Sequence, residues 1–458
     1  MPSITPTDEA AGAALTPALA DFWAMDEATR IHTLLERVKA AHAYHYERNT
    51  AYRSTVAARG IGPETRANEM PRLLRTTSLA FKSYIDVLGT PFPETRPAAF
   101  VDWLADQVSV DLRPSKQRFR DGYLSMEGLL RAVEREYSKL HLELLTSSGT
   151  SGRATIIPRD RRTEALTAES LRLCFERYLG VGADHTAIFM LPKRSRIAAA
   201  RMAGSCVRGM GLQPKKTFFA VPIAAGPDQV RVRAGVTFRP GLRGALEKNV
   251  WHSVIASLHD RLIDARAVES AVTRLIPASA HEEKVLLFGT LDRLHAVATF
   301  LLDNGRTMSL APGSVLVTAG GAGEAPAKPA AAMLDDLRRA FTLPSGEPAP
   351  IRDVYGMAEA GWAAMQCARG NYHLPPWVHA VTVDDQERFS QADRSTGLLA
   401  FFDPFGGGDL YPAFFRTSDR ATLVRGTACA CGEPGHYLED ASIRRIDLRG
   451  EAGCLGRV

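Results

Sequence analysis

The segment HLELLTSSGTSGRATIIPRD, residues 141–160, joins an apolar run to a loop of small and hydroxyl-bearing residues and then to a basic tail. Small residues let backbone N–H groups approach phosphate oxygens, and hydroxyl groups and Arg153 add donors and positive charge. The loop is not a Walker A motif, because no Gly-Lys-Ser/Thr sequence closes it. Its composition fits a flexible turn between a strand and a helix equally well, so the loop alone leaves two interpretations open.

Around this loop, short apolar runs alternate with amphipathic stretches. The runs predict buried strands at 140–145, 186–191, 216–221, 284–289 and 313–320. The amphipathic stretches between them include RTEALTAESLRLCFERYLG and ARAVESAVTRLI, which have the apolar spacing of helices. Such alternation predicts an α/β fold with a substantial parallel sheet.

The ends of the chain differ from this middle part. DEATRIHTLLERVKAAHAYHYERN, near the N-terminus, has helical periodicity and begins with acidic residues suited to a helix N-terminus. After about residue 380 the sequence becomes rich in turns and strand-like runs. We expect a helical N-terminal region at 1–85, an α/β domain at 86–425 and a short C-terminal segment at 426–458.

Composition excludes several classes of function. The chain has 458 residues, 45% of them hydrophobic and 23% charged, which is typical of globular enzymes. A net charge of +5, without any block of Lys or Arg, does not indicate a nucleic-acid-binding protein. No apolar run is long enough for a membrane span, and the N-terminus lacks the basic region of a signal peptide. These features predict a cytoplasmic protein.

Three segments further along the chain contain further candidate binding residues. VYGMAEAGW (354–362) offers the carboxylate of Glu359, a hard oxygen ligand that suits Mg²⁺, although the segment also fits a helix start with Glu359 in its first turn. FFRTSDRATLV (414–424) offers the carboxylate of Asp419, which suits ribose hydroxyls but also fits a surface turn. The remaining segment, TAGGAG (318–323), consists of small residues.

Together, these segments resemble in order the motifs of the adenylate-forming superfamily, which activates carboxylic acids with ATP as acyl-AMP. In that family the loop binds phosphate, the Tyr-Gly motif stacks near adenine and holds Mg²⁺, and the later Asp holds the ribose. This sequence departs from the pattern at Thr155, where the family often has Lys, and at Ala358, where it has Thr. Arg153 or Arg159 is a candidate for the missing charge.

The resemblance assigns nucleotide binding to Thr146, Ser147, Ser148, Gly149, Thr150, Ser151, Gly152, Arg153, Gly320, Tyr355, Gly356, Arg416 and Asp419. It assigns Mg²⁺ binding, and so a catalytic role, to Glu359. Larger relatives have a C-terminal lid whose Lys contacts the reacting carboxylate, and no Lys follows Asp419 here. We therefore expect a truncated lid, with Lys82 or Arg449 supplying the cation.

Four Cys and His residues form a second group: Cys367, His373, Cys429 and Cys431. Tetrahedral zinc takes Cys and His ligands from two short clusters, but these spacings are not those of standard zinc fingers. Spacing alone therefore favours buried cysteines with a packed or exposed His over a zinc site. CARGNYHLPPWV and CACGEPG resemble segments of phenylacetate–CoA ligases, some of which use such residues for structural zinc. That resemblance favours a zinc site, with His436 as a substitute ligand.

The resemblance is greatest to the acyl-protein synthetase family, the fatty-acid-activating component of bacterial luminescence fatty acid reductases. It covers most of residues 40–458 and includes YHLPPWV, GLLAFFDPF, YPAFFRTSD and CACGEPG. Members pass the acyl group from acyl-AMP to a cysteine near their C-terminus, which here implies Cys454. A terminal Cys without a role, or a different acceptor, is the alternative at this position.

The implied function is ATP-dependent activation of a fatty or aromatic acid, followed by transfer to a cysteine of this protein or of a partner such as a reductase. An acyl- or aryl-CoA ligase and an amide-forming synthetase share the first step, so CoA and an amine remain as alternative acceptors. An inactive nucleotide-binding scaffold is the interpretation from another class. Apolar side chains between residues 186 and 320 are expected to line the acid pocket.

Overall fold

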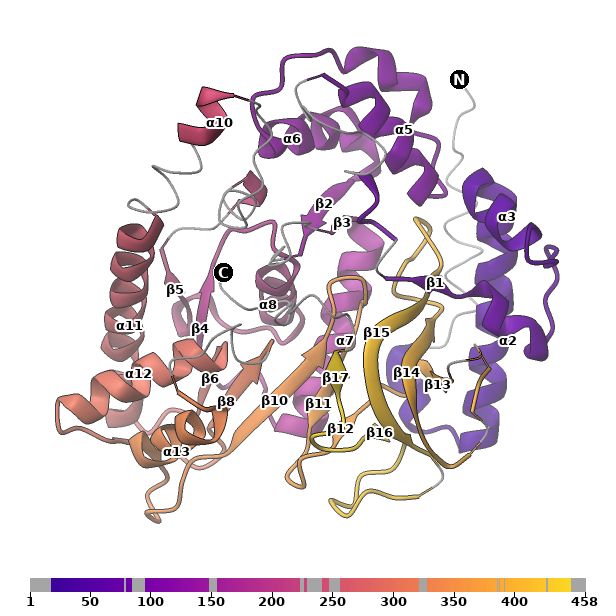
Figure 1. Ribbon diagram of the computed structural model, residues 1–458. Coiled ribbons are helices and arrows are strands. Elements are labelled where there is room, and N and C mark those ends of the chain that lie inside the picture. Colours follow the sequence, from indigo (N-terminus) through magenta and orange to yellow (C-terminus); the bar gives the residue numbers. More distant parts are fainter. Residues whose placement is uncertain are drawn as a thin grey trace.

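The computed structural model describes residues 18–77, 80–84, 95–147, 155–222, 226–228, 241–246, 256–320, 328–384, 386, 388–390, 392–425 and 427–445. A sheet of 13 strands runs through this part of the chain (Figure 1). Its strands are β1 (Arg75–Thr76), β4 (Thr186–Pro192), β5 (Thr217–Val221), β6 (Val285–Gly289), β8 (Val315–Ala319), β10 (Ile351–Gly356), β11 (Ala363–Gln366), β12 (Tyr372–His373), β13 (His379–Val383), β14 (Arg394–Asp403), β15 (Ala413–Val424), β16 (Tyr437–Leu438) and β17 (Arg444–Arg445).

The sheet has a parallel half and an antiparallel half. Strands β10, β8, β6, β4 and β5 lie side by side in that order and are parallel. From β10 the sheet continues through β11, β12, β16, β15, β14 and β13, whose pairings are antiparallel. The predicted α/β architecture and the strand-rich C-terminal part are therefore confirmed.

Helices cover the sheet (Figure 1). The α-helices are α2 (Glu27–Arg48), α3 (Thr50–Ala57), α5 (Pro97–Gln107), α6 (Met126–Glu136), α7 (Arg161–Leu179), α8 (Ala198–Gly209), α10 (Leu242–Leu246), α11 (Ala256–Ala280), α12 (Leu291–Asp303) and α13 (Ala330–Ala340). The 3-10 helices are η1 (Leu19–Trp23), η2 (Ala67–Leu73), η3 (Arg113–Arg118), η4 (Ser138–Leu140) and η5 (Pro214–Lys216). Four short strands form two separate pairs, β2 (Glu143–Thr146) with β3 (Ile156–Arg159) and β7 (Met308–Ser309) with β9 (Phe341–Thr342).

Helix ends follow local rules of capping. The Asp160 side chain accepts the Thr163 N–H at the start of α7, and Gly180 ends that helix in the left-handed conformation. In the same way Asp26 caps α2 by accepting the Thr29 N–H. These signals lie in the sequence, which explains why both helices were predicted within one or two residues of their observed bounds.

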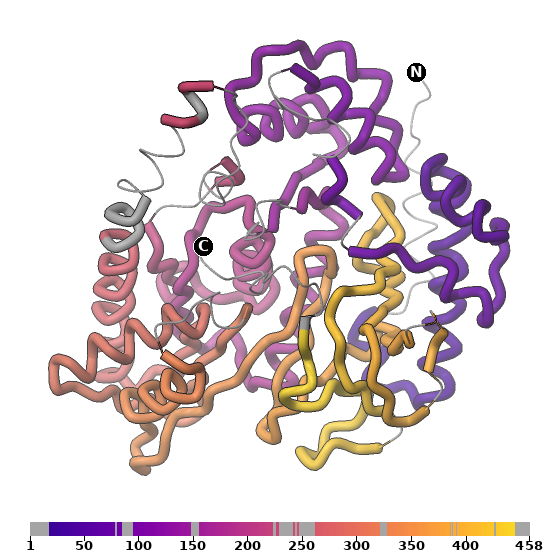
Figure 2. The backbone as a smooth tube through the Cα atoms, viewed as in Figure 1, coloured from indigo at the N-terminus to yellow at the C-terminus, as the bar shows by residue number. Residues whose placement is uncertain are grey.

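The N-terminal helices pack against the antiparallel half of the sheet, far from them in the sequence (Figure 2). Val38 of α2 and Tyr52 of α3 share one buried apolar cluster with Val381 of β13 and Phe402 of β14. In the described part of the chain, no helix has both the length and the apolar composition that crossing a membrane requires.

Candidate active site

The loop rich in Ser, Thr and Gly connects β2 to β3, which form a hairpin. β2 pairs antiparallel with β3, so the strand predicted at 140–145 lies outside the parallel sheet. The expected turn between a strand and a helix is therefore a turn between two strands. At its base the Ser147 N–H donates to the Thr155 carbonyl at 3.1 Å, and the Thr155 N–H donates to Ser147 Oγ at 2.9 Å. The predicted phosphate-binding residues Ser148–Arg153 lie outside the described residues.

Glu359 lies beside the base of this loop. It follows β10 in the turn toward β11, so the alternative interpretation of this segment as a helix start is excluded. The side chain is buried, and the Thr155 hydroxyl donates to its Oε1 at 3.4 Å. Thr155, the residue in place of the family's Lys, is thus a hydrogen-bond partner of the predicted metal-binding carboxylate.

Arg159 is held by backbone carbonyls on both sides of Glu359. Its buried guanidinium donates to the Gly406 carbonyl at 2.6 Å and to the carbonyls of Ala358 and Ala360 at 3.3 and 3.0 Å. These two carbonyls flank Glu359 on both sides. Arg159 therefore holds the turn that carries Glu359 against the turn after β14, and its role as the cation in place of a Lys at Thr155 stays a prediction.

Tyr355 and Asp419 meet although they are distant in the sequence. Tyr355 lies near the end of β10, and its hydroxyl donates to Asp419 Oδ2 at 2.7 Å. Asp419 lies within β15, so the alternative interpretation as a surface turn is excluded. Arg416 lies on the same strand, opposite Thr76 of β1. Two of the predicted nucleotide-binding side chains are thus held together across two different strands.

A pocket with a cavity volume of about 80 Å³ borders the end of β10. Its rim includes Ser147 from the loop, Gly320 from the small-residue segment after β8, Gly356 from the end of β10 and Ala358 from the turn that follows. Three of the segments singled out in the sequence therefore border one cavity.

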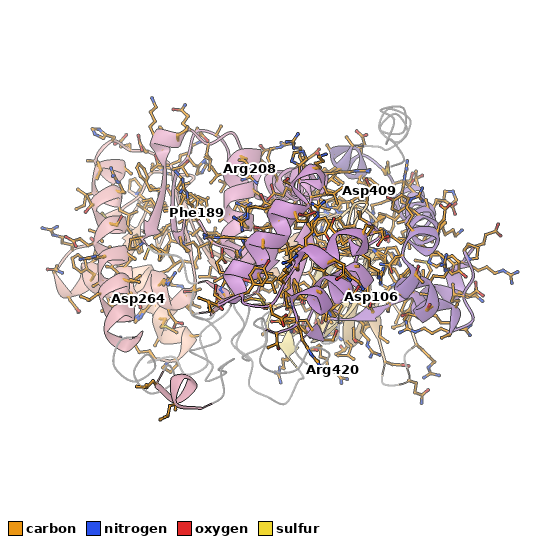
Figure 3. The ribbon with its side chains drawn as sticks, turned by 90° about the horizontal axis from the view of Figure 1, so that it is seen from above. Asp106, Phe189, Arg208, Asp264, Asp409 and Arg420 are labelled. Atoms are coloured by element: carbon orange, nitrogen blue, oxygen red, sulfur yellow. The ribbon has the colours of Figure 1, made fainter. Side chains whose placement is uncertain are left out.

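The interior of the pocket is apolar and lies between the sheet and helices α7 and α8. Phe189 and Phe288 line it from β4 and β6, and Leu171 and Phe175 from α7. Figure 3 labels Phe189 and also Arg208, near the end of α8. Phe189 and Phe288 belong to the predicted region 186–320, whereas Leu171 and Phe175 lie outside it.

A buried carboxylate supports the turn after β14. Asp403 Oδ1 accepts the N–H groups of Phe405 and Gly406 at 2.9 and 2.8 Å. A Cβ at Gly406 would lie only 2.0 Å from Asp403 Oδ2, so this close approach requires glycine. Because Arg159 bonds to the Gly406 carbonyl, Asp403 is part of the same support for Glu359.

Burial raises the pKa of Asp403 to about 6, although the two N–H donors act in the opposite direction. A raised pKa means that the folded protein binds this proton more tightly than the unfolded chain. Its contribution to stability is therefore present at low pH and is lost as the pH rises from about 4 to about 6. We expect Asp403→Asn, which keeps the Oδ1 acceptor, to stabilise the protein relative to the wild type by about 1–3 kcal/mol at pH 8 and by less at pH 5. Denaturant titrations at both pH values measure this, and a difference independent of pH would contradict it.

Of the two candidate cations for the reacting carboxylate, Lys82 and Arg449, Lys82 belongs to the described residues. Lys82 is half-buried and follows Phe81, whose carbonyl accepts the Ile156 N–H at 3.0 Å, so Lys82 lies near the end of the loop. Phe81 has φ +61, and its ring packs against Tyr411 with centroids 4.9 Å apart. Arg449 and Cys454 lie outside the described residues.

The four predicted metal ligands converge. One ligand atom from each of Cys367, His373, Cys429 and Cys431 lies within 4.8 Å of all the others. The Sγ atoms of Cys367 and Cys429 are 3.9 Å apart, and Cys431 Sγ lies 3.3 Å from His373 Nε2. His436 instead contacts Glu27 Oε1 at 3.1 Å.

Burial lowers the pKa of His373, which favours the neutral imidazole that metals require. With Zn–S near 2.3 Å and Zn–N near 2.0 Å, tetrahedral geometry requires separations of roughly 3.8 and 3.5 Å, close to those observed. The residues therefore fit a zinc ion.

The C-terminal part of the sequence matches a known family. Residues 259–457 match the model of the family described as acyl-protein synthetase, LuxE. The resemblance predicted from the motifs is confirmed over these residues.

Two relatives are named long-chain-fatty-acid–luciferin-component ligase. The protein from Aliivibrio fischeri is 31% identical over 104 residues, which are 23% of this chain and 26% of that protein. The protein from Vibrio harveyi is 23% identical over 220 residues, 45% of this chain and 55% of that protein. The matched part thus spans about a quarter to about half of these relatives.

Solved structures show the same fold. 2-Hydroxyisobutyryl-CoA ligase in complex with 2-HIB-AMP and CoA has a TM-score of 0.57 at 15% identity, covering 95% of this chain and 74% of that chain. The same ligase in the postadenylation state has a TM-score of 0.55 at 14% identity, covering 92% of this chain and 69% of that chain. The predicted fold of the large domain of adenylate-forming enzymes is therefore confirmed.

Proposed function

We propose, from the match of residues 259–457 to acyl-protein synthetases and from the site described above, that this protein activates a carboxylic acid with ATP as acyl-AMP. One observation carries the proposal: Ser147, Gly320, Gly356 and Ala358, from three separate motifs, border one apolar pocket. The pocket offers a place for an apolar acid whose carboxylate lies at the rim. Glu359 and Tyr355 belong to one of these motifs, and Asp419 accepts a hydrogen bond from Tyr355.

In the proposed reaction, a carboxylate oxygen of the acid attacks the α-phosphorus of ATP, the bond to the β-phosphate oxygen breaks, and pyrophosphate leaves. Bound Mg²⁺ would neutralise phosphate charge, and Glu359 is the carboxylate that would hold it. Tyr355 and Asp419 would bind the nucleoside, since Asp419 keeps acceptor capacity beyond its bond to Tyr355. Lys82 is the proposed cation for the reacting carboxylate.

The second step would transfer the acyl group to a thiol. A thiolate attacks the acyl carbonyl, a thioester forms, and AMP leaves. Cys454 is the proposed acceptor, or else a cysteine of a partner such as a reductase. An acyl-CoA ligase and an amide-forming synthetase would use the same first step with CoA or an amine as acceptor.

We further propose that Cys367, His373, Cys429 and Cys431 hold a structural zinc ion. A zinc ion would join the hairpin of β11 and β12 to the segment before β16. Because β11 pairs with β10, which carries Tyr355, the zinc ion would also stabilise the position of the strand that bears this nucleotide-binding residue.

The proposal is tested by exchange of labelled pyrophosphate into ATP with a panel of fatty and aromatic acids. Acid-dependent exchange is expected, whereas no exchange with any acid would favour an inactive nucleotide-binding scaffold. Labelled acid and ATP, with wild type and Cys454→Ser, then identify the acceptor. A protein-bound thioester that persists in Cys454→Ser would exclude Cys454, and product released only with CoA or an amine would indicate those acceptors.

Tyr355→Phe tests the nucleotide site separately. It removes the hydrogen bond to Asp419 at 2.7 Å but keeps the ring. We expect the KM for ATP to rise about five- to tenfold, since such a bond contributes about 1 kcal/mol, while the KM for the acid stays constant. Steady-state kinetics with each substrate varied in turn measure this. Equal increases for both substrates would contradict a nucleotide-specific role.

A further inference from the structure

Two turns of the same design carry the three proposed cysteine ligands of zinc. The segments that begin at Cys367 and at Cys429 both have the sequence Cys-x-x-Gly. In each turn the glycine N–H donates to the carbonyl of the first cysteine, at 3.0 Å for Gly370 and at 2.9 Å for Gly432. Both glycines have a positive φ, +85° and +90°, a conformation that other residues rarely adopt.

Asn371 joins these two turns and a third segment. It directly follows the first turn, and its carbonyl accepts the Cys367 N–H at 2.9 Å. Its side-chain Nδ2 donates to Cys429 Sγ in the second turn at 3.3 Å. Its Oδ1 accepts the N–H of Asp440, between β16 and β17, at 3.0 Å. One amide side chain therefore connects three parts of the chain.

The orientation of this amide is fixed by its partners. A backbone N–H can only donate, so the amide atom that faces the Asp440 N–H is the oxygen. The NH₂ group then faces Cys429 Sγ and acts as a donor to it. A Cβ at Gly370 would lie only 2.5 Å from Asp440 Oδ2, so the segment at Asp440 packs directly on the first turn. This packing keeps the amide between Asp440 and the thiol.

The charge of the site gives this donor a function. Three thiolates and a neutral His373 around Zn²⁺ would leave a net negative charge, and Cys367 and Cys429 are buried. Burying charge is unfavourable unless hydrogen bonds compensate for it. Cys367 Sγ accepts the Arg369 N–H at 3.4 Å, a bond that comes with the turn itself. The bond to Cys429 Sγ depends instead on the side chain of Asn371.

We propose that Asn371 is a positioning residue of the zinc site, and that its amide holds the Cys429 thiolate toward the ion and reduces the negative charge on the sulfur. This inference rests on the proposed zinc ion and adds a residue outside the four ligands that sets the affinity for the metal. Hydrogen-bond partners of metal ligands commonly change metal affinity by about 10- to 100-fold.

Competition with a zinc chelator measures the affinity in the wild type, Asn371→Ala and Asn371→Asp. We expect the Kd for zinc to rise about 10- to 100-fold in Asn371→Ala. We expect a larger rise in Asn371→Asp, which keeps the oxygen that accepts the Asp440 N–H but places a negative charge against the Cys429 thiolate.

Asn304→Ala is the matched control for these variants. Asn304 is exposed at the end of α12, where its Nδ2 donates to the Phe300 carbonyl at 2.7 Å. The substitution removes an amide donor of the same kind from a residue that is not next to the four clustered ligands. It should leave the Kd for zinc unchanged.

Cobalt(II) bound in place of zinc separates an effect on the thiolate from a general loss of structure. A thiolate that loses a hydrogen bond is more easily oxidised, so its sulfur-to-cobalt charge-transfer absorption moves to longer wavelength. We expect this shift in Asn371→Ala and no shift in Asn304→Ala. The position of the band does not depend on the fraction of the protein that is folded.

Wild-type affinity for zinc in both Asn371 variants would overturn the inference. Weaker binding with an unmoved cobalt band would overturn it as well, because Asn371 would then support the fold without acting on the thiolate. Equal losses of affinity in Asn371→Ala and Asn304→Ala would also contradict it. A wild type that binds neither ion at these cysteines would instead refute the zinc site itself.

Discussion

Glu359→Gln should lower the rate of acid-dependent pyrophosphate exchange by about 100- to 1000-fold, the usual cost of losing one charged group that stabilises a transition state. The substitution keeps the size of the side chain and the oxygen that accepts from the Thr155 hydroxyl. It removes the negative charge that the proposed Mg²⁺ site requires. The affinity for the acid, for which we propose the apolar pocket, should change much less.

The control for this variant is Glu47→Gln, which makes the same chemical change at a side chain that is 74% exposed. It should leave exchange unaltered. Melting curves of both variants should remain close to that of the wild type, so that the loss of rate reflects chemistry and not folding. A Glu359→Gln protein with more than a tenth of wild-type exchange would show that Glu359 does not hold the metal.

Cys429→Ser should abolish zinc binding and lower the free energy of unfolding by about 4 kcal/mol or more, as loss of a structural metal does. Three ligands would remain, and the buried Cys367 Sγ would lose its neighbour at 3.9 Å. We also expect a higher KM for ATP, because β11, which pairs with β12, lies next to the strand that carries Tyr355.

Metal analysis of the purified protein, with one zinc per chain expected, measures the first effect, and denaturant titration measures the second. Cys174→Ala is the matched control, since Cys174 is buried in α7 and is not one of the four clustered residues. It should retain zinc even if it lowers stability. Wild-type protein without zinc, or Cys429→Ser with full zinc content, would contradict the site.

The parallel half of the sheet could be predicted because its strands are buried on both faces. The side chains of β4, β6 and β8 are all buried, so each strand appears in the sequence as a continuous apolar run. The hairpin of β2 and β3 was not predicted, because two four-residue strands lack a periodic pattern and their pairing depends on the loop between them.

The candidate site was predicted in part. The sequence was sufficient to name Glu359, Tyr355 and Asp419, because they belong to motifs that occur in a recognisable order. The contacts of Arg159 were not predicted, because its partners are carbonyls some 200 residues away, and backbone groups leave no signal in composition. Asp403 was missed although FFDPFGGG contains a signal, an Asp followed by glycines that permit close packing.

The contribution of α7 to the lining of the pocket was not predicted from the sequence. Leu171 and Phe175 belong to an amphipathic helix, and an apolar helix face is the same in sequence whether it meets a core or a cavity. The spacing of the four Cys and His residues was also ambiguous. Only the fold shows that β12 and the segment before β16 lie side by side.

The fate of the carboxylate oxygens tests the central claim most directly. The acid is supplied with both carboxyl oxygens labelled by heavy isotope, together with unlabelled ATP and a thiol acceptor, and the products are separated for mass spectrometry. If the acid attacks the α-phosphorus, AMP will carry one labelled oxygen for each acyl group transferred, and pyrophosphate will carry none. Label in inorganic phosphate with ADP as the other product, or AMP formed without label, would contradict an acyl-AMP intermediate.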